Sequence, residues 1–478
     1  MPQSLSDAWL ALLDLHDLRW ILGVGWAIYI VGLGGWIVLQ KREPVATLSW
    51  LFGLALLPYV GFIVYWWLGP QRIKRHRLRR MRSKTHRLPS DSGEDVIARE
   101  LSRLGTATTG LPPTTAREVR MLVDGATKYA ALLVDIATAQ VSIDLEYYIF
   151  LPDRTGTAVR DALIERARAG VKVRLLLDAV GSGKCSRRFL DPLIAAGGEF
   201  AWFHPMRFGR IWRRPWLNLR THRKIVVIDG RIAYTGGINI TDEENELLRP
   251  DAYRDVHMRV VGEVARSLQV LFAEDWSYAT GQPPVLTPAL SVDDTPGAHA
   301  VQVVGSGPDS HWEAIHRMHV SAIHAARRRV WLTTPYFVPG EAAMMALTAA
   351  ALAGLDVRLL VPRTSDSRVV TWAARSYFDE LLAAGVRVYE YAPRLLHSKT
   401  LLVDDHLVIV GTANFDHRSF RLNFEVSLLF HDAQVAGELE RTIETDLAHS
   451  PRVREDRPRP LWSVRLPEAL ARLVSPLL

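Results

Sequence analysis

An internal repeat constrains the fold of this 478-residue chain more than any other feature. Four segments recur in the same order. The recurring pairs are 169–176 with 353–360, 195–198 with 383–386, 146–150 with 334–338, and the stretches that begin at His222 and His397. Four landmarks in one order indicate a duplicated unit. We therefore expect two similar halves, residues 114–285 and 299–478, joined by a segment rich in Pro and Gly.

Each half alternates helix-like stretches with short apolar runs. The predicted strands of the first half are 141–149, 171–177, 225–228 and 256–261, and its clearest predicted helices are 157–169 and 264–278. This alternation is typical of an α/β fold in which helices cover a sheet.

A His-x-Lys-x4-Asp motif, followed by a glycine-containing turn and an asparagine, occurs once in each half. The two sets are His222, Lys224, Asp229 and Asn239, and His397, Lys399, Asp404 and Asn414. With 16 His in the chain, chance would supply on the order of 0.01–0.02 such motifs. A lone His-Lys pair usually lies on the surface without a catalytic role, but two complete sets indicate an active site.

The spacing suits cleavage of a phosphodiester. Residues i and i+2 of a strand project from the same face, so the His and Lys of each motif point into one site. One histidine can attack phosphorus and form a phosphohistidine, while the other protonates the departing oxygen. Lysine and asparagine donors would bind the phosphoryl oxygens. We expect no metal and no other cofactor, because the sequence offers no carboxylate cluster to bind one.

The N-terminal residues 1–70 contain two long uncharged runs, 20–40 and 45–68. Each can cross a hydrocarbon core of roughly 30 Å, and aromatic residues lie towards their ends. We expect a transmembrane hairpin, and hence a multi-pass protein of the cell membrane. A re-entrant hairpin, or one buried in a soluble domain, remains an alternative, whereas a cleaved signal peptide fits poorly.

Positive charge is concentrated directly after the hairpin. Nine Lys and Arg residues and no acid lie between Arg72 and Arg87, so the other residues together carry −2 of the net charge of +7. This basic flank, followed by a predicted linker up to residue 113, would hold the catalytic part in the cytoplasm and attract anionic lipids. The nearly neutral remainder argues against a nucleic-acid track.

Three further features lie outside the motifs and the hairpin. The basic and aromatic stretch 207–216 is either a lipid contact or an ordinary exposed loop. Leu466, Leu470, Leu473 and Val474 have helical spacing, and we expect this C-terminal helix to dock on its domain rather than lie on a membrane. The single cysteine, Cys185, excludes an intramolecular disulfide.

The motifs resemble those of the phospholipase D superfamily, and of bacterial cardiolipin synthases in particular. The resemblance rests on the hairpin, its KREP connector at 41–44, NLRTHRK at 218–224 and GTANFDHRS at 411–419. It implies two α/β halves, each a mixed sheet flanked by helices, which are related by a pseudo-twofold axis and bring both motifs to one site.

The resemblance also implies residue roles. His222 would be the nucleophile and His397 the general acid and base, although the near symmetry of the motifs leaves the order open. An acid after each motif, Asp255 or Glu425, would orient its histidine. We expect Asp229 and Asp404 to make structural salt bridges, although they belong to the motif. Gly237 replaces a common serine, and we expect little consequence.

The function implied is transfer of a phosphatidyl group between two phosphatidylglycerol molecules, giving cardiolipin and glycerol. Alternatives are hydrolysis of phospholipid or nucleic acid, and transfer with phosphatidylethanolamine or another alcohol. A non-catalytic lipid-binding protein is a third class, which the complete motif sets disfavour.

Overall fold

The computed structural model describes residues 15–39, 44–56, 93–205, 219–287, 296–310 and 312–475. The chain divides into two compact units. The first comprises residues 1–71 with 207–218, and the second comprises residues 72–206 with 219–478. The predicted basic flank 72–87 and the basic and aromatic stretch 207–216 lie outside the described residues.

The described part of the first unit is a pair of helices, α2 (Leu15–Leu39) and α3 (Pro44–Leu56). Ile37 and Leu54 are buried between them, while most of their other described apolar side chains are exposed. In the part of the chain that the structure describes, no helix combines the length and the apolar character that crossing a membrane requires. Residues 57–68 of the second predicted span lie outside that part, and the membrane hairpin stays a prediction.

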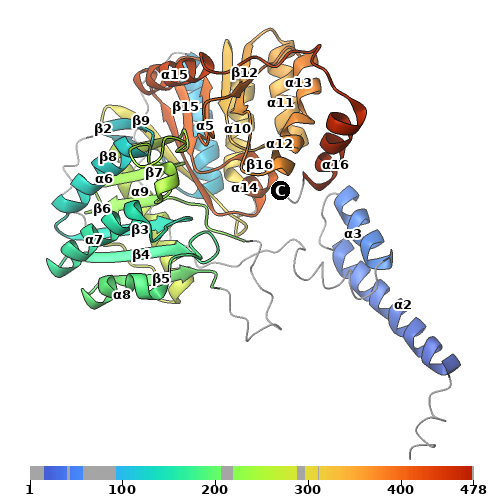
Figure 1. Cartoon of the computed structure of the whole chain (residues 1–478), viewed down its shortest axis with the longest axis horizontal. Helices are drawn as coiled ribbons and strands as arrows, with labels where there is room; N and C mark the ends of the chain where they lie inside the picture. Colours follow the sequence, from blue (N-terminus) through green and yellow to red (C-terminus); the bar gives the residue numbers. More distant parts are fainter. Residues whose placement is uncertain are drawn as a thin grey trace, which may run out of the picture. The chain divides into compact units, whose positions relative to one another are not determined.

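Two sheets form the centre of the second unit (Figure 1). In spatial order, the strands of the seven-stranded sheet are β2 (Glu118–Val123), β8 (Val256–Val261), β7 (Ile232–Gly236), β6 (Ile225–Ile228), β3 (Ser142–Tyr147), β4 (Lys172–Asp178) and β5 (Glu199–Phe203). Strands β3, β4 and β5 are parallel, and the other neighbouring pairs are antiparallel.

The eight-stranded sheet repeats this order. Its strands are β1 (Thr114–Ala116), β9 (His299–Ser306), β17 (Glu425–His431), β15 (Leu407–Gly411), β14 (Thr400–Val403), β10 (Arg329–Thr333), β12 (Asp356–Pro362) and β13 (Arg387–Tyr391). From β9 onward each strand has its counterpart, in position and direction, in the first sheet. The predicted duplication and the mixed α/β class are therefore confirmed.

Helices flank both sheets, and the predicted strands and helices of the first half are present within a few residues. The helices of the first half are α6 (Gly125–Thr138), α7 (Arg154–Arg168), α8 (Arg187–Ala195) and α9 (Val264–Thr280). Those of the second half are α10 (Ala314–Ala325), α11 (Glu341–Leu352), α12 (Arg368–Arg375), α13 (Phe378–Ala383), α14 (His417–Arg421), α15 (Ala433–Leu447) and α16 (Leu466–Val474), preceded by the short turn η3 (Leu461–Arg465).

The two halves share a hydrophobic core. One cluster joins side chains of β6 and β8, such as Val227 and Met258, to side chains of β9 and β17, such as Val303 and Leu428. Leu268 of α9 belongs to the same cluster. Because each half buries part of its sheet against the other, the pair forms one body rather than two separate domains.

Part of the predicted linker is helical and belongs to the second half. Helix α5 (Gly93–Thr109) buries Leu101 in the core of that half, with Ile97 and Leu104 packed beside it. Strand β1, which was assigned to the first half, pairs with β9 of the second sheet. The Ser- and Thr-rich composition obscured a short apolar stripe at i, i+4 and i+7, which is typical of an amphipathic helix.

Candidate active site

Each motif histidine is anchored by the main chain of the other half. The backbone N–H of His222 donates to the carbonyl of Phe424 at 2.9 Å, and that of His397 donates to the carbonyl of Arg254 at 2.7 Å. Phe424 and Arg254 directly precede the two acids expected to orient the histidines. Two short parallel bridges, Thr221 with Phe424 and Arg254 with Leu396, thus bring both motifs to one place.

The histidine–acid pairs cross between the halves. Nδ1 of His222 lies 3.0 Å from a carboxylate oxygen of Glu425, and Nδ1 of His397 lies 2.7 Å from Oδ2 of Asp255. The expected pairing of each acid with the histidine of its own motif is corrected by this geometry. A carboxylate accepts only from a protonated nitrogen, so Nδ1 carries the proton and Nε2 is the free position of each neutral ring.

The motif lysines lie buried beside the histidines. Nζ of Lys224 donates to the carbonyl of His222 at 3.0 Å, and Nζ of Lys399 donates to that of His397. Burial and the charge of Lys399 from the other half lower the pKa of Lys224 to about 8. The two ammonium groups repel each other in this buried site. A bound anion, such as a phosphodiester, would offset that repulsion.

The two acids carry their charge unequally. Burial raises the pKa of Asp255 to about 6 despite the nearby charge of Lys399. Burial also acts on Glu425, but the charge of His222 and the hydrogen bonds to the carboxylate outweigh it, and the pKa of Glu425 is lowered. One of those bonds comes from Oγ1 of Thr412, at 2.5 Å.

Position 237 explains part of this inequality. It occupies the place of Thr412 in the first half, but a Cβ added to Gly237 would lie 2.2 Å from both carboxylate oxygens of Asp255. A side chain at this position would require the Asp255 carboxylate to move, and in its observed place Asp255 has no counterpart of the Thr412 bond. The substitution of glycine for serine therefore has a consequence that the sequence did not predict.

The two asparagines lie in matching turns with different supports. Asn239 donates from its backbone and from Nδ2 to the carboxylate of Glu244, at 2.8 and 2.7 Å. The backbone of Asn414 donates instead to Oγ of Ser419, at 3.2 Å. Both supporting residues follow their asparagine by five positions. The site is asymmetric at this point because one supporting group is a carboxylate and the other is a hydroxyl.

Glu244 and Lys128 were missed by the sequence analysis. Lys128 of α6 is fully buried, donates to the carbonyl of Asn239 at 3.1 Å and lies near Glu244, whose charge raises the Lys128 pKa while burial lowers it well below its usual value. The available signal was a lysine within the largely apolar stretch 125–138, which forms α6 and was not predicted as a helix. The rings of Tyr148 and Tyr253 also border the site, with centroids 5.0 Å from His222 and 5.7 Å from His397.

The motif aspartates lie at the far ends of the strands that carry the motifs. Asp229 accepts hydrogen bonds from the backbone N–H groups of residues 140–142, and Asp404 from those of residues 327–329, at 2.7–3.2 Å. Both have a positive φ, 52° and 51°. The expected salt bridges are thus replaced by bonds that tie each helix–strand turn to its sheet.

The site is poorly suited to binding a metal cation. Glu244, Asp255 and His397 place potential ligand atoms within 4.8 Å of one another. However, Glu244 is engaged by Asn239 and Asp255 by His397, and the ammonium groups of both motif lysines act on Asp255. The lysine charges and the hydrogen-bond donors of the site therefore favour an anion over a metal ion.

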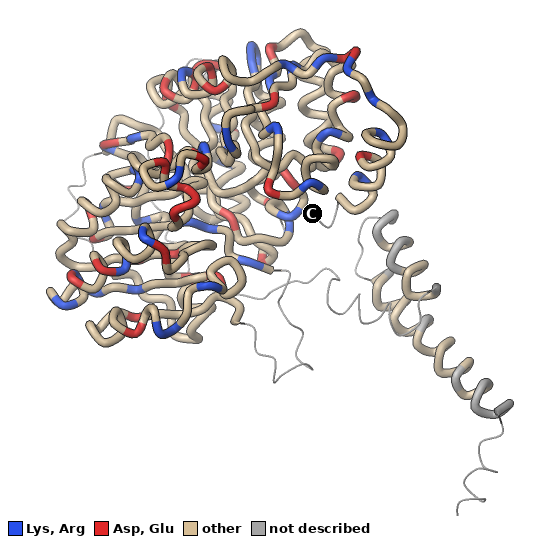
Figure 2. The backbone as a smooth tube through the Cα atoms, in the orientation of Figure 1, with Lys and Arg blue, Asp and Glu red and all other residues tan. Residues whose placement is uncertain are grey.

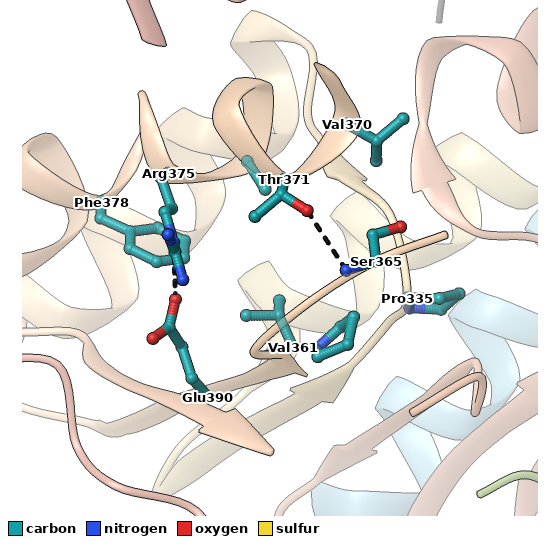
Figure 3. A pocket seen from close by; sticks show the side chains of 10 residues that line it. Pro335, Val361, Ser365, Val370, Thr371, Arg375, Phe378 and Glu390 are labelled. Carbon is teal, nitrogen blue, oxygen red and sulfur yellow. Dashed lines mark hydrogen bonds and ion pairs between the residues drawn. The ribbon is translucent and has the colours of Figure 1, made fainter. Parts of the chain in front are cut away.

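Two other features lie away from the motifs. A small pocket in the second half is bordered by the ion pair of Arg375 with Glu390, 2.8 Å long, and by Oγ1 of Thr371, which accepts from the backbone of Ser365 (Figure 3). None of its lining residues belongs to a motif. Cys185 is buried, and burial raises its thiol pKa to about 11, so it is poorly suited to nucleophilic chemistry.

Comparison with known proteins agrees with the fold. The family described as "Cardiolipin synthase, PLD-like domain" matches residues 132–276 and 320–447, one segment in each half. The chain is 38% identical over 466 residues to a cardiolipin synthase of Geobacillus kaustophilus strain HTA426, covering 92% of this chain and 91% of the relative. It is 39% identical over 470 residues to cardiolipin synthase 2 of Bacillus anthracis, covering 93% and 89%.

Among solved structures, phosphatidylserine synthase from Haemophilus influenzae Rd KW20 has the same fold. It superposes with a TM-score of 0.60 at 14% identity, over 79% of this chain and 100% of the other. The two-half architecture is thus that of the phospholipase D-like proteins. The chain belongs to the cardiolipin synthase family of that superfamily.

Proposed function

We propose that this protein is a cardiolipin synthase, which transfers the phosphatidyl group of one phosphatidylglycerol to the glycerol hydroxyl of a second and releases glycerol. The observation that carries the proposal is the composite site. In it, each of two histidines is paired with an acid from the opposite half, and a buried lysine lies beside each histidine. Such a set supplies a nucleophile, a proton donor and an anion-binding cradle together.

In the first step, Nε2 of His222 attacks phosphorus and the bond to the glycerol oxygen breaks. His397 enters this step as an imidazolium, with its Nδ1–H bound to Asp255, and its Nε2–H gives its proton to that oxygen as glycerol leaves. The lysines and asparagines donate to the non-bridging oxygens. His222 suits the nucleophilic role because Glu425, whose pKa is lowered, stabilises the positive charge that forms on the ring.

In the second step, His397 takes the proton from the glycerol hydroxyl of a second phosphatidylglycerol. The resulting oxygen attacks phosphorus, and the bond to His222 breaks. The product is cardiolipin, and both histidines return to their starting states. Water entering in place of the second lipid would give phosphatidic acid, so this step also decides between transfer and hydrolysis.

We also propose that the N-terminal helices form a hairpin in the cell membrane, with the catalytic body on the cytoplasmic side. The two uncharged runs and the nine basic residues that follow them support this arrangement. Within the body, Lys and Arg alternate with Asp and Glu along the chain (Figure 2), a pattern that suits a lipid enzyme better than a nucleic-acid track.

The test is incubation of the purified full chain with phosphatidylglycerol vesicles. We expect cardiolipin and glycerol in equal amounts, and losses of roughly 10³-fold or more in His222→Ala and His397→Ala. His324→Ala, which alters an exposed histidine of α10, should retain full activity. Phosphatidic acid as the main product would contradict the proposal, and adding phosphatidylethanolamine would reveal a different second lipid.

A further inference from the structure

The C-terminal segment 461–474, formed by η3 and α16, packs on the body through its small and polar side chains. Ala471 belongs to the core of the second half, and α16 lies against α12 (Figure 1). Glu468 is buried and accepts from Arg459 at 2.6 Å, and Ser475, just beyond the helix, contacts the hydroxyl of Tyr377 at 3.1 Å. The predicted docking is therefore confirmed, but not through the leucines.

The large apolar side chains of the same segment point away from the body. They are 38–78% exposed and comprise Leu461, Trp462, Leu466, Leu470, Leu473 and Val474. Trp462, Leu466 and Leu470 follow at intervals of four, so they form one stripe along the helical surface. A docked helix normally buries its large apolar side chains and exposes its small ones. In this segment the small side chains are buried and the large apolar ones are exposed.

Positive charge accompanies this stripe. Residues 452–474 contain six arginines and three acids, a net charge of +3, and counting the body acids Asp379 and Glu380, which form ion pairs with Arg457, Arg459 and Arg472, leaves 3 − 2 = +1. Arg465 and Arg472 are exposed within the segment itself. An apolar stripe with a tryptophan and flanking arginines is typical of a helix that lies in a membrane interface, where arginines contact anionic headgroups.

We propose that residues 461–474 bind the surface of a bilayer that contains anionic phospholipid and hold the body against the membrane that supplies its substrate. This inference rests on the proposed function, since it assumes that the substrate comes from a bilayer. The net charge favours the bilayer over a second copy of the chain, because two such segments would repel each other while anionic lipid attracts both.

The test uses the full chain with a single environment-sensitive fluorophore on Leu470→Cys, in a Cys185→Ala background. The protein is reconstituted into phosphatidylglycerol-containing vesicles that carry nitroxide-labelled acyl chains. We expect the nitroxide lipid to quench the label by about twofold or more. The matched control is Val134→Cys on α6, which is also exposed and apolar, and it should show no quenching.

Other outcomes overturn the inference. Quenching between labels on two copies, without lipid quenching, would indicate an interface between copies. A label that is already shielded in the lipid-free protein, and that lipid does not quench, would mean that the chain covers this face itself. Because the measurement does not depend on turnover, it stands even if the protein makes no cardiolipin.

Activity provides a second readout. The double variant Leu470→Asn with Leu473→Asn should lower the rate on phosphatidylglycerol vesicles by roughly tenfold, through a raised apparent KM. The rate on a monomeric short-chain phosphatidylglycerol should stay at the wild-type level. Equal losses on both substrates would indicate damage to the fold and contradict the interfacial role.

Discussion

His222 and His397 each depend on a carboxylate that lies about two hundred or one hundred and forty positions away in the sequence. Each acid directly follows the residue whose carbonyl accepts from the backbone N–H of its partner histidine. The site therefore functions only when both halves are in register. At this scale the structure divides the active residues into two crossed groups, His222 with Glu425 and His397 with Asp255.

The crossed groups can be separated kinetically with a phosphatidyl ester of p-nitrophenol. This leaving group departs without a proton donor, so the first step then needs only the nucleophile and its acid. We expect His222→Ala and Glu425→Gln to abolish the burst of p-nitrophenol. His397→Ala and Asp255→Asn should retain the burst but lose turnover by roughly 10²–10⁴-fold.

The grouping of the variants is the decisive result. If Asp255→Asn behaved like His222→Ala, the acid of each half would serve its own motif, against the observed contacts. If the two histidine variants exchanged their behaviour, His397 would be the nucleophile and the pairing would still hold. Mass spectrometry of the trapped phosphohistidine would identify the residue.

Lys224 should set an alkaline limit on activity. Burial and the charge of Lys399 bring the pKa of Lys224 to about 8, so the free enzyme loses this ammonium group as the pH rises through that value. We expect kcat/KM to fall above a pH of about 8. Bound phosphodiester favours the ammonium, so the limit in kcat should lie at a higher pH.

The control is Lys224→Arg, which keeps its charge throughout this range. Its kcat/KM should be lower overall, because a guanidinium fits the buried space poorly, but the fall near pH 8 should disappear. A wild-type profile that stays flat from about 7 to about 10 would contradict the assignment. Steady-state rates on short-chain phosphatidylglycerol provide the measurement.

At the scale of elements, the motif aspartates act on turns rather than on substrate. Asp229 accepts the three N–H groups of the α6–β3 turn, and Asp404 those of the α10–β10 turn. Asp229→Asn places an amide donor against backbone donors. We expect a loss of roughly 2–3 kcal/mol in folding free energy and a lower melting temperature. At assay temperatures well below the melting temperature, kcat should stay near the wild-type value.

Thermal unfolding monitored by circular dichroism, alongside activity, checks this expectation. The control is Asp405→Asn, which removes the charge of the exposed acid beside Asp404 in the second half and should change the melting temperature little. A loss of activity comparable to that of His222→Ala, without a change in melting temperature, would instead place Asp229 in the chemistry.

The sequence predicted those elements whose signal is local. Helices α7 and α9 and four strands of the first half, β3, β4, β6 and β8, were predicted because their apolar residues form local patterns in the sequence. Strands β2, β5 and β7 were not predicted. The motifs were found because i and i+2 share a strand face. The crossed pairing of Asp255 and Glu425 with the histidines was not predicted. It depends on how the two halves pack together, which no local sequence pattern indicates.

At the scale of the whole molecule, the halves are interleaved as well as duplicated. The core between the sheets includes Val227 of the first half and Leu428 of the second. Helix α5 and strand β1 precede the first half in the sequence but complete the second. Gln302 of β9 donates to the carbonyls of Ser102 and Leu111, at 3.2 and 2.9 Å, which ties this segment down with polar as well as apolar contacts.

Two truncations test this interleaving. A chain that begins at Gly93 keeps α5 and β1, so we expect it to retain the thermal transition of the body and activity on monomeric short-chain phosphatidylglycerol. A chain that begins at Arg117 exposes the edge of β9, uncovers the core around Leu101 and leaves Gln302 without these acceptors. Because exposed edges and uncovered cores promote association, it should aggregate or melt at a clearly lower temperature. Equal melting temperatures for the two chains, measured by circular dichroism on soluble material, would show that residues 93–113 are the dispensable linker that their composition suggested and that β1 is dispensable too.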